Sequence, residues 1–313
     1  MKQRYKNTIK HEALVLLAIF VFISITGCAA TRHASQRAVI STVDTTVDDI
    51  VDNLLRTKNA AFVEDGLPGA LLLITGMVEL DPDNYDLLST TSFLYCAYGL
   101  FVEDENPDYA ISLYRVGAEY GLRAMKVNNS KFRNALESGM KIPDAAKYLQ
   151  KEDLKGTNWY GVNIGKRCTL QLDSIEETLD IKDAVAIAKR VIEIDPNYAW
   201  GASHILMGIF HSIIPSYLAL GDGPDGRGGG PDAAKEEFAL ANKAMDGKFG
   251  LTDVFQARYL GPLLKDRGLF DQLLTRVIEM DSCEIEGGFC LLNELAKKKA
   301  KWSIDHKTQY FGW

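Results

Sequence analysis

The sequence predicts an all-α protein. Apolar side chains recur at the spacing of a helical face along most of the chain, as in Ala234, Phe238, Ala241 and Met245, which stand at positions 0, 4, 7 and 11. This spacing puts them on one side of a helix with about 3.6 residues per turn. Strand patterns are almost absent, because no alternation of apolar and polar residues is sustained and few hairpin turns of the Asn-Gly or Asp-Gly type separate apolar runs.

Start and stop residues divide this pattern into segments. Asp-Pro pairs end one helix and open the next, because proline disfavours helical geometry in the residue before it. Proline also suits the first turn of a helix, where its missing N–H would have no partner. The apolar stripes between such points predict helices at residues 38–58, 68–80, 84–101, 107–126, 129–137, 143–151, 157–173, 180–194, 197–219, 232–246, 251–265, 268–280 and 287–305.

Two of the junctions are nearly identical. Asp81-Pro82-Asp83-Asn84-Tyr85 is echoed by Asp195-Pro196-Asn197-Tyr198, and a third version has Ser282 in place of the proline. A helix that ends in Asp-Pro-Asn-Tyr before another helix resembles the junction between tetratricopeptide (TPR) repeats. The junctions are not spaced at multiples of about 34 residues, as they would be in a regular array. We therefore expect TPR-like stacked helical hairpins, an α-solenoid-like body, with insertions; unrelated hairpins that share a turn are the alternative.

The N-terminus has the pattern of an export signal. A basic start precedes an apolar run at residues 13–23, which is shorter than the roughly 20 residues of a transmembrane helix. The run ends in Thr26-Gly27-Cys28, which resembles the lipobox of bacterial lipoproteins. That resemblance implies that Cys28 becomes the first mature residue and carries a lipid such as palmitate. An ordinary secretory signal or an anchor helix with an incidental cysteine is the alternative.

These patterns divide the chain into a signal peptide (1–27), a lipidated linker (28–37), a helical domain (38–306) and a C-terminal tail (307–313). The formal charge is −7 for the whole chain and −10 without the signal, which holds four basic residues and one acid. Nucleic-acid binding needs clustered Lys and Arg, so this balance argues against it. It also argues against docking on anionic lipid by charge, so the lipid on Cys28 has to supply the membrane affinity.

Four further cysteines, Cys96, Cys168, Cys283 and Cys290, have no zinc-ligand or CxxC spacing. We expect four core or near-surface thiols. A disulfide between Cys283 and Cys290 is the alternative, because Gly287-Gly288 between them would allow a bend. On one continuous helix the two would lie roughly 10 Å apart, too far for a bridge.

The segment Gly221–Pro231 is dense in glycine and proline, which forbids continued helix. A phosphate loop would follow a strand and end in Gly-Lys-Ser/Thr, and a calcium loop would place its acids at alternating positions. The segment does neither. We expect a connector or a loop that contacts a partner, and its role stays open at this stage.

Aromatic side chains are the better candidates for a binding site. The chain has no Gly-x-Ser-x-Gly, His-Glu-x-x-His or Ser-x-x-Lys motif, so we expect no enzyme, no cofactor and no metal. Amphipathic rings line ligand grooves and anchor interfaces. The candidates for ligand or partner contact are Trp159, Tyr160, Trp200 and Tyr259. Ordinary core packing is the alternative.

His204 and His211 follow Trp200 on much the same stripe of the predicted helix and complete the candidate set. They lie two turns apart, roughly 10 Å, so they cannot share one zinc ion unaided. A polar-edged packing face is the ordinary interpretation.

Six segments of the C-terminal half together form a recognisable pattern, at 195–202, 214–216, 229–238, 257–259, 266–270 and 273–274. With these segments, the C-terminal half resembles the T-component (TatT) family of TPR-like lipoproteins associated with TRAP transporters. The lipobox, the length and the helix with Trp159-Tyr160 also fit, so the likeness covers most of residues 40–305.

This resemblance implies a periplasmic, mostly helical protein that is not an enzyme. It implies homo-oligomers, with a trimer described, association with the solute-binding P subunit of a TRAP system, and a pore or cleft for apolar ligands. The chain departs from the pattern in its long loop at 221–230 and in Ser282.

Three hypotheses of function compete. The first is a lipid-anchored periplasmic scaffold that binds the solute-receptor subunit of a TRAP system and a hydrophobic small molecule. The second is an envelope-assembly scaffold without a transport role, and the third is a metal hydrolase that uses His204, His211 and nearby carboxylates. Ala29, which follows Cys28, is not the Asp that retains many lipoproteins at the inner membrane. By that analogy we expect the protein at the periplasmic leaflet of the outer membrane.

Overall fold

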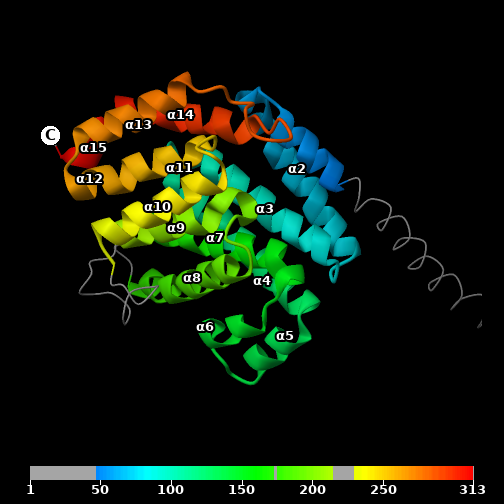
Figure 1. Ribbon diagram of the computed structural model, residues 1–313. Helices are drawn as coiled ribbons and strands as arrows, with labels where there is room; N and C mark the ends of the chain where they lie inside the picture. The colour runs from blue at the N-terminus through cyan, green and yellow to red at the C-terminus, as the bar shows by residue number, and fades with distance from the viewer. Residues whose placement is uncertain (1–46, 173–174, 214–228, 313) are drawn as a thin grey trace, which may run out of the picture. The chain divides into compact units, whose positions relative to one another are not determined.

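Helices make up nearly all of the structure, a computed structural model that describes residues 47–172, 175–213 and 229–312 (Figure 1). Across these ranges no strand occurs, which confirms the all-α prediction. The stacked TPR-like arrangement stays a prediction. The predicted signal peptide, the linker with Cys28 that is predicted to be lipidated, and most of the Gly-rich loop lie outside the described residues.

The first long helices each begin at an asparagine. After a helical segment at 47–56, the chain forms α2 (Ala60–Leu80), α3 (Tyr85–Val102) and α4 (Pro107–Asn128). The side-chain oxygens of Asn59, Asn84 and Asn106 accept hydrogen bonds from backbone N–H groups in the first turns of these helices. Such caps bond backbone N–H groups that have no partner within the first turn of a helix. The capping residue therefore sets each of these helix starts.

The next elements are short and lead into a central helix. Figure 1 shows α5 and α6 together at one end of the helical body, below α4. The predicted helix at 143–151 is divided into shorter elements. The elements are α5 (Ser130–Glu137), α6 (Ile142–Ala145), the 3₁₀ turns η1 (Ala146–Tyr148) and η2 (Lys151–Asp153), and α7 (Leu154–Leu170).

The C-terminal half continues the series. A π-helical segment, η4, interrupts the predicted helix at 251–265. The last helix falls within residues 307–313, where the sequence predicts a C-terminal tail. The elements are α8 (Ile175–Ile194), α9 (Tyr198–Ile213), α10 (Pro231–Ala244), α11 (Gly250–Phe255), η4 (Gln256–Leu260), α12 (Gly261–Leu264), α13 (Arg267–Glu279), α14 (Leu291–Asp305) and α15 (Lys307–Phe311).

Helix α7 lies at the centre and packs against α3, α4, α8 and α9. The approach to α4 is close, because a Cβ at Gly121 would lie 2.9 Å from the Cα of Tyr160. Asn163 on α7 donates to the backbone oxygen of Ser92 on α3 at 3.1 Å. A larger side chain at position 121 would therefore push α4 away from the helix that organises the core.

Helix α2 starts eight residues earlier than predicted. The expected start at Pro68 is wrong, because Pro68 lies inside the helix. Buried Val63 and Leu67 continue the inward stripe of Leu71, Ile74 and Val78, so burial favours helix on both sides of the proline. Within the described ranges, α2 is the one helix whose length and mean hydropathy of 1.4 would suit a membrane span.

The expectation of four free thiols is wrong for two of them. Cys283 and Cys290 form a disulfide, with Cα atoms 4.3 Å apart. They do not share a helix: Gly287 and Gly288 adopt positive φ angles of 83° and 69° and turn the chain back before α14 begins. Cys96 and Cys168 are buried thiols, as expected.

Candidate functional site

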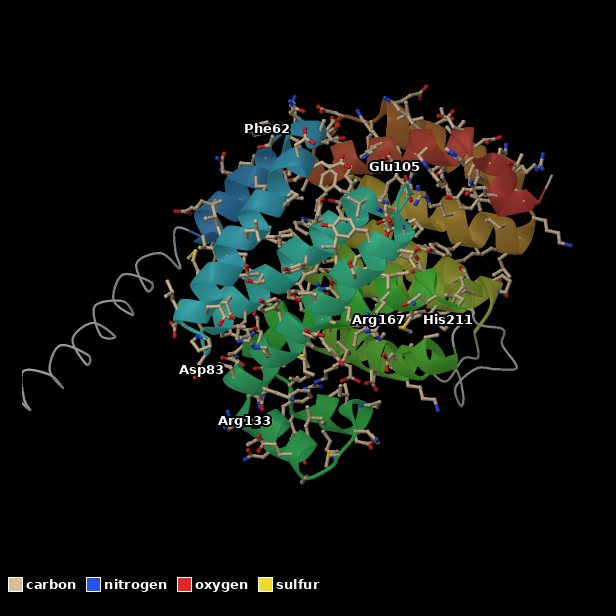
Figure 2. All side chains as sticks on the ribbon, turned by 180° about the vertical axis from the view of Figure 1, so that it is seen from behind. Phe62, Asp83, Glu105, Arg133, Arg167 and His211 are labelled. Atoms are coloured by element: carbon tan, nitrogen blue, oxygen red, sulfur yellow. A yellow bond between two sulfur atoms is a disulfide. The ribbon has the colours of Figure 1, made fainter. Side chains whose placement is uncertain are left out.

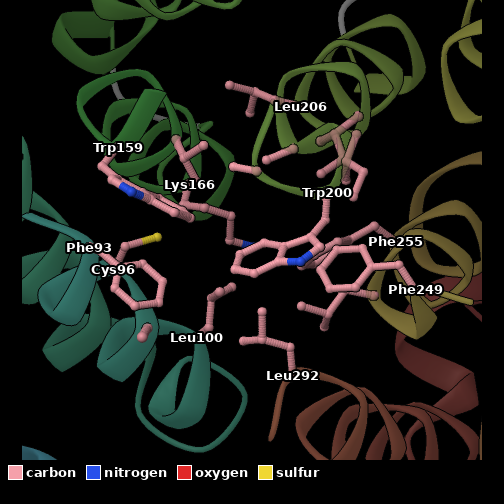
Figure 3. A pocket seen from close by; sticks show the side chains of 17 residues that line it. Phe93, Cys96, Leu100, Trp159, Lys166, Trp200, Leu206, Phe249, Phe255 and Leu292 are labelled. Atoms are coloured by element: carbon pink, nitrogen blue, oxygen red, sulfur yellow. The ribbon is translucent and has the colours of Figure 1, made fainter. Parts of the chain in front are cut away.

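An apolar pocket lies between α3, α7, α9, α11 and the start of α14 (Figure 3). Among the described residues that line it, Lys166 is the one charged side chain. The wall consists of Phe93, Cys96, Ala97, Leu100, Trp159, Val162, Lys166, Ala199, Trp200, Ala202, Ile205, Leu206, Ile209, Phe249, Leu251, Phe255 and Leu292. Apolar cavities of this kind are suited to apolar ligand groups.

Two tryptophans separate this pocket from an outer groove. Phe93, Trp159, Ala199 and Trp200 line both spaces. The pocket has a cavity volume of about 60 Å³ and the groove one of about 650 Å³. The groove is more polar than the pocket, with Asp48, Asp52, Lys155 and Glu286 on its walls.

Trp200 reaches the pocket through a left-handed turn. Ala199, Trp200 and Gly201 have φ angles of 49°, 61° and 73° at the start of α9. Side chains rarely adopt this conformation, which costs about 1–2 kcal/mol per residue. The turn places the Trp200 ring against Phe249, at a centroid distance of 5.7 Å, and edge-on to Phe289 at 6.4 Å.

Trp159 occupies the opposite side of the pocket. Its ring centroid lies 4.6 Å from that of Phe93 on α3, and Figure 3 shows both rings beside Cys96. Ring pairs at this distance add to the stability of a contact beyond the area they bury. Trp159 is thus held in place by a ring on α3. Trp200 is held by Phe249 in the loop before α11 and by Phe289 in the loop before α14.

A buried ionic cluster lies behind the pocket wall. The ammonium of Lys166 is 3.0 Å from Glu103 Oε2, and that of Lys299 is 2.9 Å from Glu103 Oε1. Lys299 also bonds Asp104 at 3.1 Å, and Arg258 donates to both oxygens of Asp104, at 2.7 and 2.9 Å. The cluster therefore joins the segment just after α3 to α7, η4 and α14 through three cations and two carboxylates.

The cluster keeps its carboxylates ionised. Burial acts to raise the pKa of Glu103, but the ammonium groups of Lys166 and Lys299 outweigh it and lower that pKa. The same balance lowers the pKa of Asp104, through Lys299 and Arg258. Burial lowers the pKa of Lys299, whereas the charge of Glu103 overcomes burial at Lys166 and raises its pKa.

The structure brings two of the predicted site residues into the pocket wall, Trp159 and Trp200. Tyr259 lies behind it on η4, with its ring centroid 6.4 Å from that of Phe255. Tyr160 points the other way, into the hydrophobic core of α4, α7 and α8. Burial raises the pKa of the Tyr160 hydroxyl well above its usual range.

The two candidate histidines lie on the far face of α9. His204 Nδ1 is 2.6 Å from Glu237 Oε2 on α10, and both side chains are buried. The expected stripe with Trp200 is wrong, because the left-handed turn rotates Trp200 away from the helical phase of His204 and His211. In the described parts of the chain, no group of three or more His, Cys, Asp or Glu is placed to hold a metal ion.

Sequence reasoning missed most of the pocket wall. Lys166, Leu100 and Leu292 fall in three different predicted helices, and Phe249 falls in a loop between two others. No local signal marks these positions, because their common surface exists only after the helices pack.

The sequence was compared with models of known protein families. A family model described as TRAP transporter T-component matches residues 57–311. The chain belongs to the TRAP transporter T-component family. This result confirms the resemblance drawn from the sequence. No curated protein matches the chain.

T-components are parts of transport systems and do not form an enzyme family, so this T-component is associated with a TRAP transporter and with the cell envelope. The match includes every residue of the pocket wall and of the ionic cluster behind it.

Proposed function

We propose that this T-component binds an apolar small molecule in its pocket and groove and serves the solute-receptor (P) subunit of a TRAP uptake system. The observation that carries the proposal is the apolar pocket between α3, α7, α9 and α11, with Trp159 and Trp200 at its mouth. Membership of the T-component family supports the link to transport.

The two cavities favour an elongated ligand. About 10–15 Å³ of such volume holds one water, so the 60 Å³ of the pocket takes only a short apolar end. The remaining length fits the groove, which is about ten times larger and has a polar rim. The ligand thus passes between Trp159 and Trp200, and its polar part faces the groove.

Tryptophan fluorescence tests this proposal, because two of the four tryptophans line the pocket. A brominated alkane is the probe, since bromine quenches a nearby indole. We expect saturable quenching in the wild type and an affinity at least about tenfold lower for Val162→Phe, which fills the pocket. Leu240→Phe on the exposed side of α10 is the matched control and should bind as the wild type does. Equal affinity for both variants would contradict the proposal.

Association with the P subunit is the second part of the proposal. Purification of the intact protein from its envelope should bring down a periplasmic solute-binding protein, and recovery of unrelated partners alone would contradict it. The alternative, an envelope-assembly scaffold without a transport role, predicts assembly factors instead. The neighbouring genes separate the two, since TRAP permease and P-subunit genes beside this one favour transport.

Lipid anchoring at Cys28 completes the proposal. We expect palmitate labelling of the wild type and none for Cys28→Ser, together with release from the membrane. Ala29 favours the periplasmic leaflet of the outer membrane, and membrane fractionation tests that location. A homotrimer is the oligomer that the family resemblance implies, and native mass measurement of the lipidated protein tests it.

A further inference from the structure

A run of four buried hydroxyl side chains lies on α3, which extends between Asp83 and Glu105 in Figure 2. The four are consecutive in the sequence: Ser89, Thr90, Thr91 and Ser92. Neighbouring residues of a helix point in different directions, because each is turned by about 100° from the last. The four hydroxyls therefore meet different surroundings, and each needs its own hydrogen-bond partner.

Three of these hydroxyls are bonded within the chain. Those of Ser89 and Thr91 donate to backbone oxygens one turn earlier in α3, each at 2.7 Å. That of Ser92 donates to the backbone oxygen of Gly117 on α4, also at 2.7 Å. The Thr90 hydroxyl has no hydrogen-bond partner among the described residues, although only 2% of the residue is exposed. A buried hydroxyl in this state destabilises the folded protein, because it has left water without gaining a partner.

Of the four residues, Thr90 is the one that lines the outer groove. It stands one turn before Phe93, and Phe93 stands one turn before Ala97, so the three lie on one face of α3. Phe93 lines both spaces and Ala97 lines the pocket. Thr90 thus follows the apolar pocket on the groove side, roughly 10 Å along the helix from Ala97. Rotation about its Cα–Cβ bond turns the hydroxyl towards the groove without movement of the backbone.

We propose that Thr90 binds the hydroxyl group of an amphipathic alcohol whose hydrocarbon end fills the pocket. This inference rests on the proposed function, in which the pocket takes an apolar ligand, and it adds the class of the ligand's polar group. An alcohol both donates and accepts a hydrogen bond, as Thr90 does. It therefore supplies the partner that the described chain does not, in whichever direction the bond is made.

The surroundings of Thr90 favour an uncharged head group. The nearby groove wall includes Phe93 and Trp159, whose ring centroids lie 4.6 Å apart. A charged group that leaves water for such an apolar site needs an opposite charge to compensate it. A hydroxyl needs only one hydrogen bond, so its transfer from water to this site costs much less.

The charged side chains of the groove do not provide that compensation. Lys155, the one basic residue on the described groove wall, already lies 2.8 Å from Asp48. Asp52 and Glu286 are exposed, so water screens their attraction for an ammonium group. Both also repel a carboxylate. An alcohol is therefore the head group that the groove accepts at the depth of Thr90.

Two brominated probes of equal chain length test the inference by tryptophan quenching. One is bromooctane, and the other is octanol with its bromine on the last carbon, at the apolar end. The ratio of their affinities measures what the hydroxyl contributes to binding. Thr90→Val replaces the hydroxyl of Thr90 by a methyl group. We expect this variant to bind the alcohol about fivefold more weakly than the wild type does and to bind the alkane equally well.

Thr91→Val is the matched control. Thr91 is equally buried on the same helix, but its hydroxyl is bonded to Leu87 and it does not line the groove. This variant should keep the wild-type affinity for both probes. Urea unfolding without any probe also separates the two variants. Thr91→Val should lower the midpoint because it loses a hydrogen bond, whereas Thr90→Val should not, because it removes a hydroxyl without a partner.

The outcomes distinguish this inference from the proposed function. A loss confined to Thr90→Val and to the alcohol supports the inference. If Thr90→Val binds both probes as the wild type does, the inference is overturned and the apolar pocket stands. If neither probe quenches the wild type, the proposed function fails, and the inference fails with it. Tighter binding of octanoate with its bromine on the last carbon would also overturn the inference, because the preferred head group would then be an ion.

Discussion

The ammonium of Lys166 lies 3.0 Å from Glu103 Oε2 and 4.5 Å from the centre of the Phe255 ring. One side chain therefore belongs to both the apolar pocket and the ionic cluster behind it. The Glu103 carboxylate neutralises the charge of Lys166. On its other side the ammonium faces the Phe255 ring, and an aromatic face attracts a cation. The pocket wall stays apolar because its one charged group, in the described structure, is turned to Glu103.

Removal of this charge should destabilise the protein strongly. Lys166→Met keeps the length of the side chain but leaves Glu103 with less compensation in a buried site. Breaking a buried pair costs about 3–5 kcal/mol, and we expect about 3 kcal/mol because Lys299 still faces Glu103. Urea unfolding measures the loss.

Lys307→Met is the matched control. Lys307 pairs with Asp271 at the surface, where both side chains are partly exposed. Such pairs contribute about 1 kcal/mol or less. Equal losses for the two variants would show that the cluster behind the pocket is not a stabilising unit.

Asp183 on α8 should make stability depend on pH near neutrality. Burial, and then the charge of Asp180, raises the pKa of Asp183 to about 6. The unfolded chain releases this proton near pH 4. The contribution of Asp183 to stability is therefore full below about pH 4 and is lost as the pH rises through 6, where the half-buried carboxylate must ionise.

Asp183→Asn removes this loss. We expect the variant to gain stability over the wild type as the pH rises from 4 to 7, with a modest size because the group is only half buried. Urea unfolding midpoints across this range are the measurement. Asp49→Asn, at an exposed carboxylate, is the control for the loss of one negative charge. A parallel pH profile for both variants would contradict the prediction.

Helix boundaries could be predicted where a proline or a capping residue stands at the boundary itself. Pro82 and Asn84 stop one helix and cap the next, and the start of α3 follows within a residue of the prediction. Pro107 with its cap Asn106 fixes α4 in the same way. Pro68 does not start α2, because the burial of Val63 and Leu67 outweighs the cost of proline inside a helix. The two side chains are buried by packing against α3, and the sequence around Pro68 does not reveal this contact.

The site was harder to predict because its partners are distant in sequence. Lys166 and Lys299 meet at Glu103 across separations of 63 and 196 residues. Trp200 was a candidate for its chemistry alone, and its left-handed backbone has no marker besides Gly201 beside it. The disulfide stayed an alternative because the bend at Gly287-Gly288 was visible but its direction was not.

The Cys283–Cys290 disulfide should stabilise the wall of the outer groove. It closes a short loop that includes Ile285, Glu286 and Phe289, all of which line the groove. A bridge of this loop length contributes about 2–3 kcal/mol. We expect the double variant Cys283→Ser with Cys290→Ser to lose that amount in urea unfolding. A reducing agent should lower the stability of the wild type to the same level and leave the variant unchanged, and an insensitive wild type would contradict the bridge.

Gly201→Ala should displace Trp200 from the pocket mouth. Gly201 has a φ of 73°, and an added Cβ would lie 3.2 Å from the Cα of Ala241 on α10. The left-handed conformation costs a residue with a side chain about 1–2 kcal/mol, and the contact with α10 adds to it. We expect a loss of about 2–3 kcal/mol, together with a shift of Trp200 fluorescence and weaker quenching by the brominated probe.

Gly247→Ala isolates the contribution of the contact. Its φ of 72° is nearly the same, but nothing described lies within 4 Å of the added Cβ. This control should therefore show only the conformational cost, about 1–2 kcal/mol, with the binding of the probe unchanged. If both variants lost equal stability and kept full binding, the turn at 199–201 would not be what holds Trp200 at the pocket.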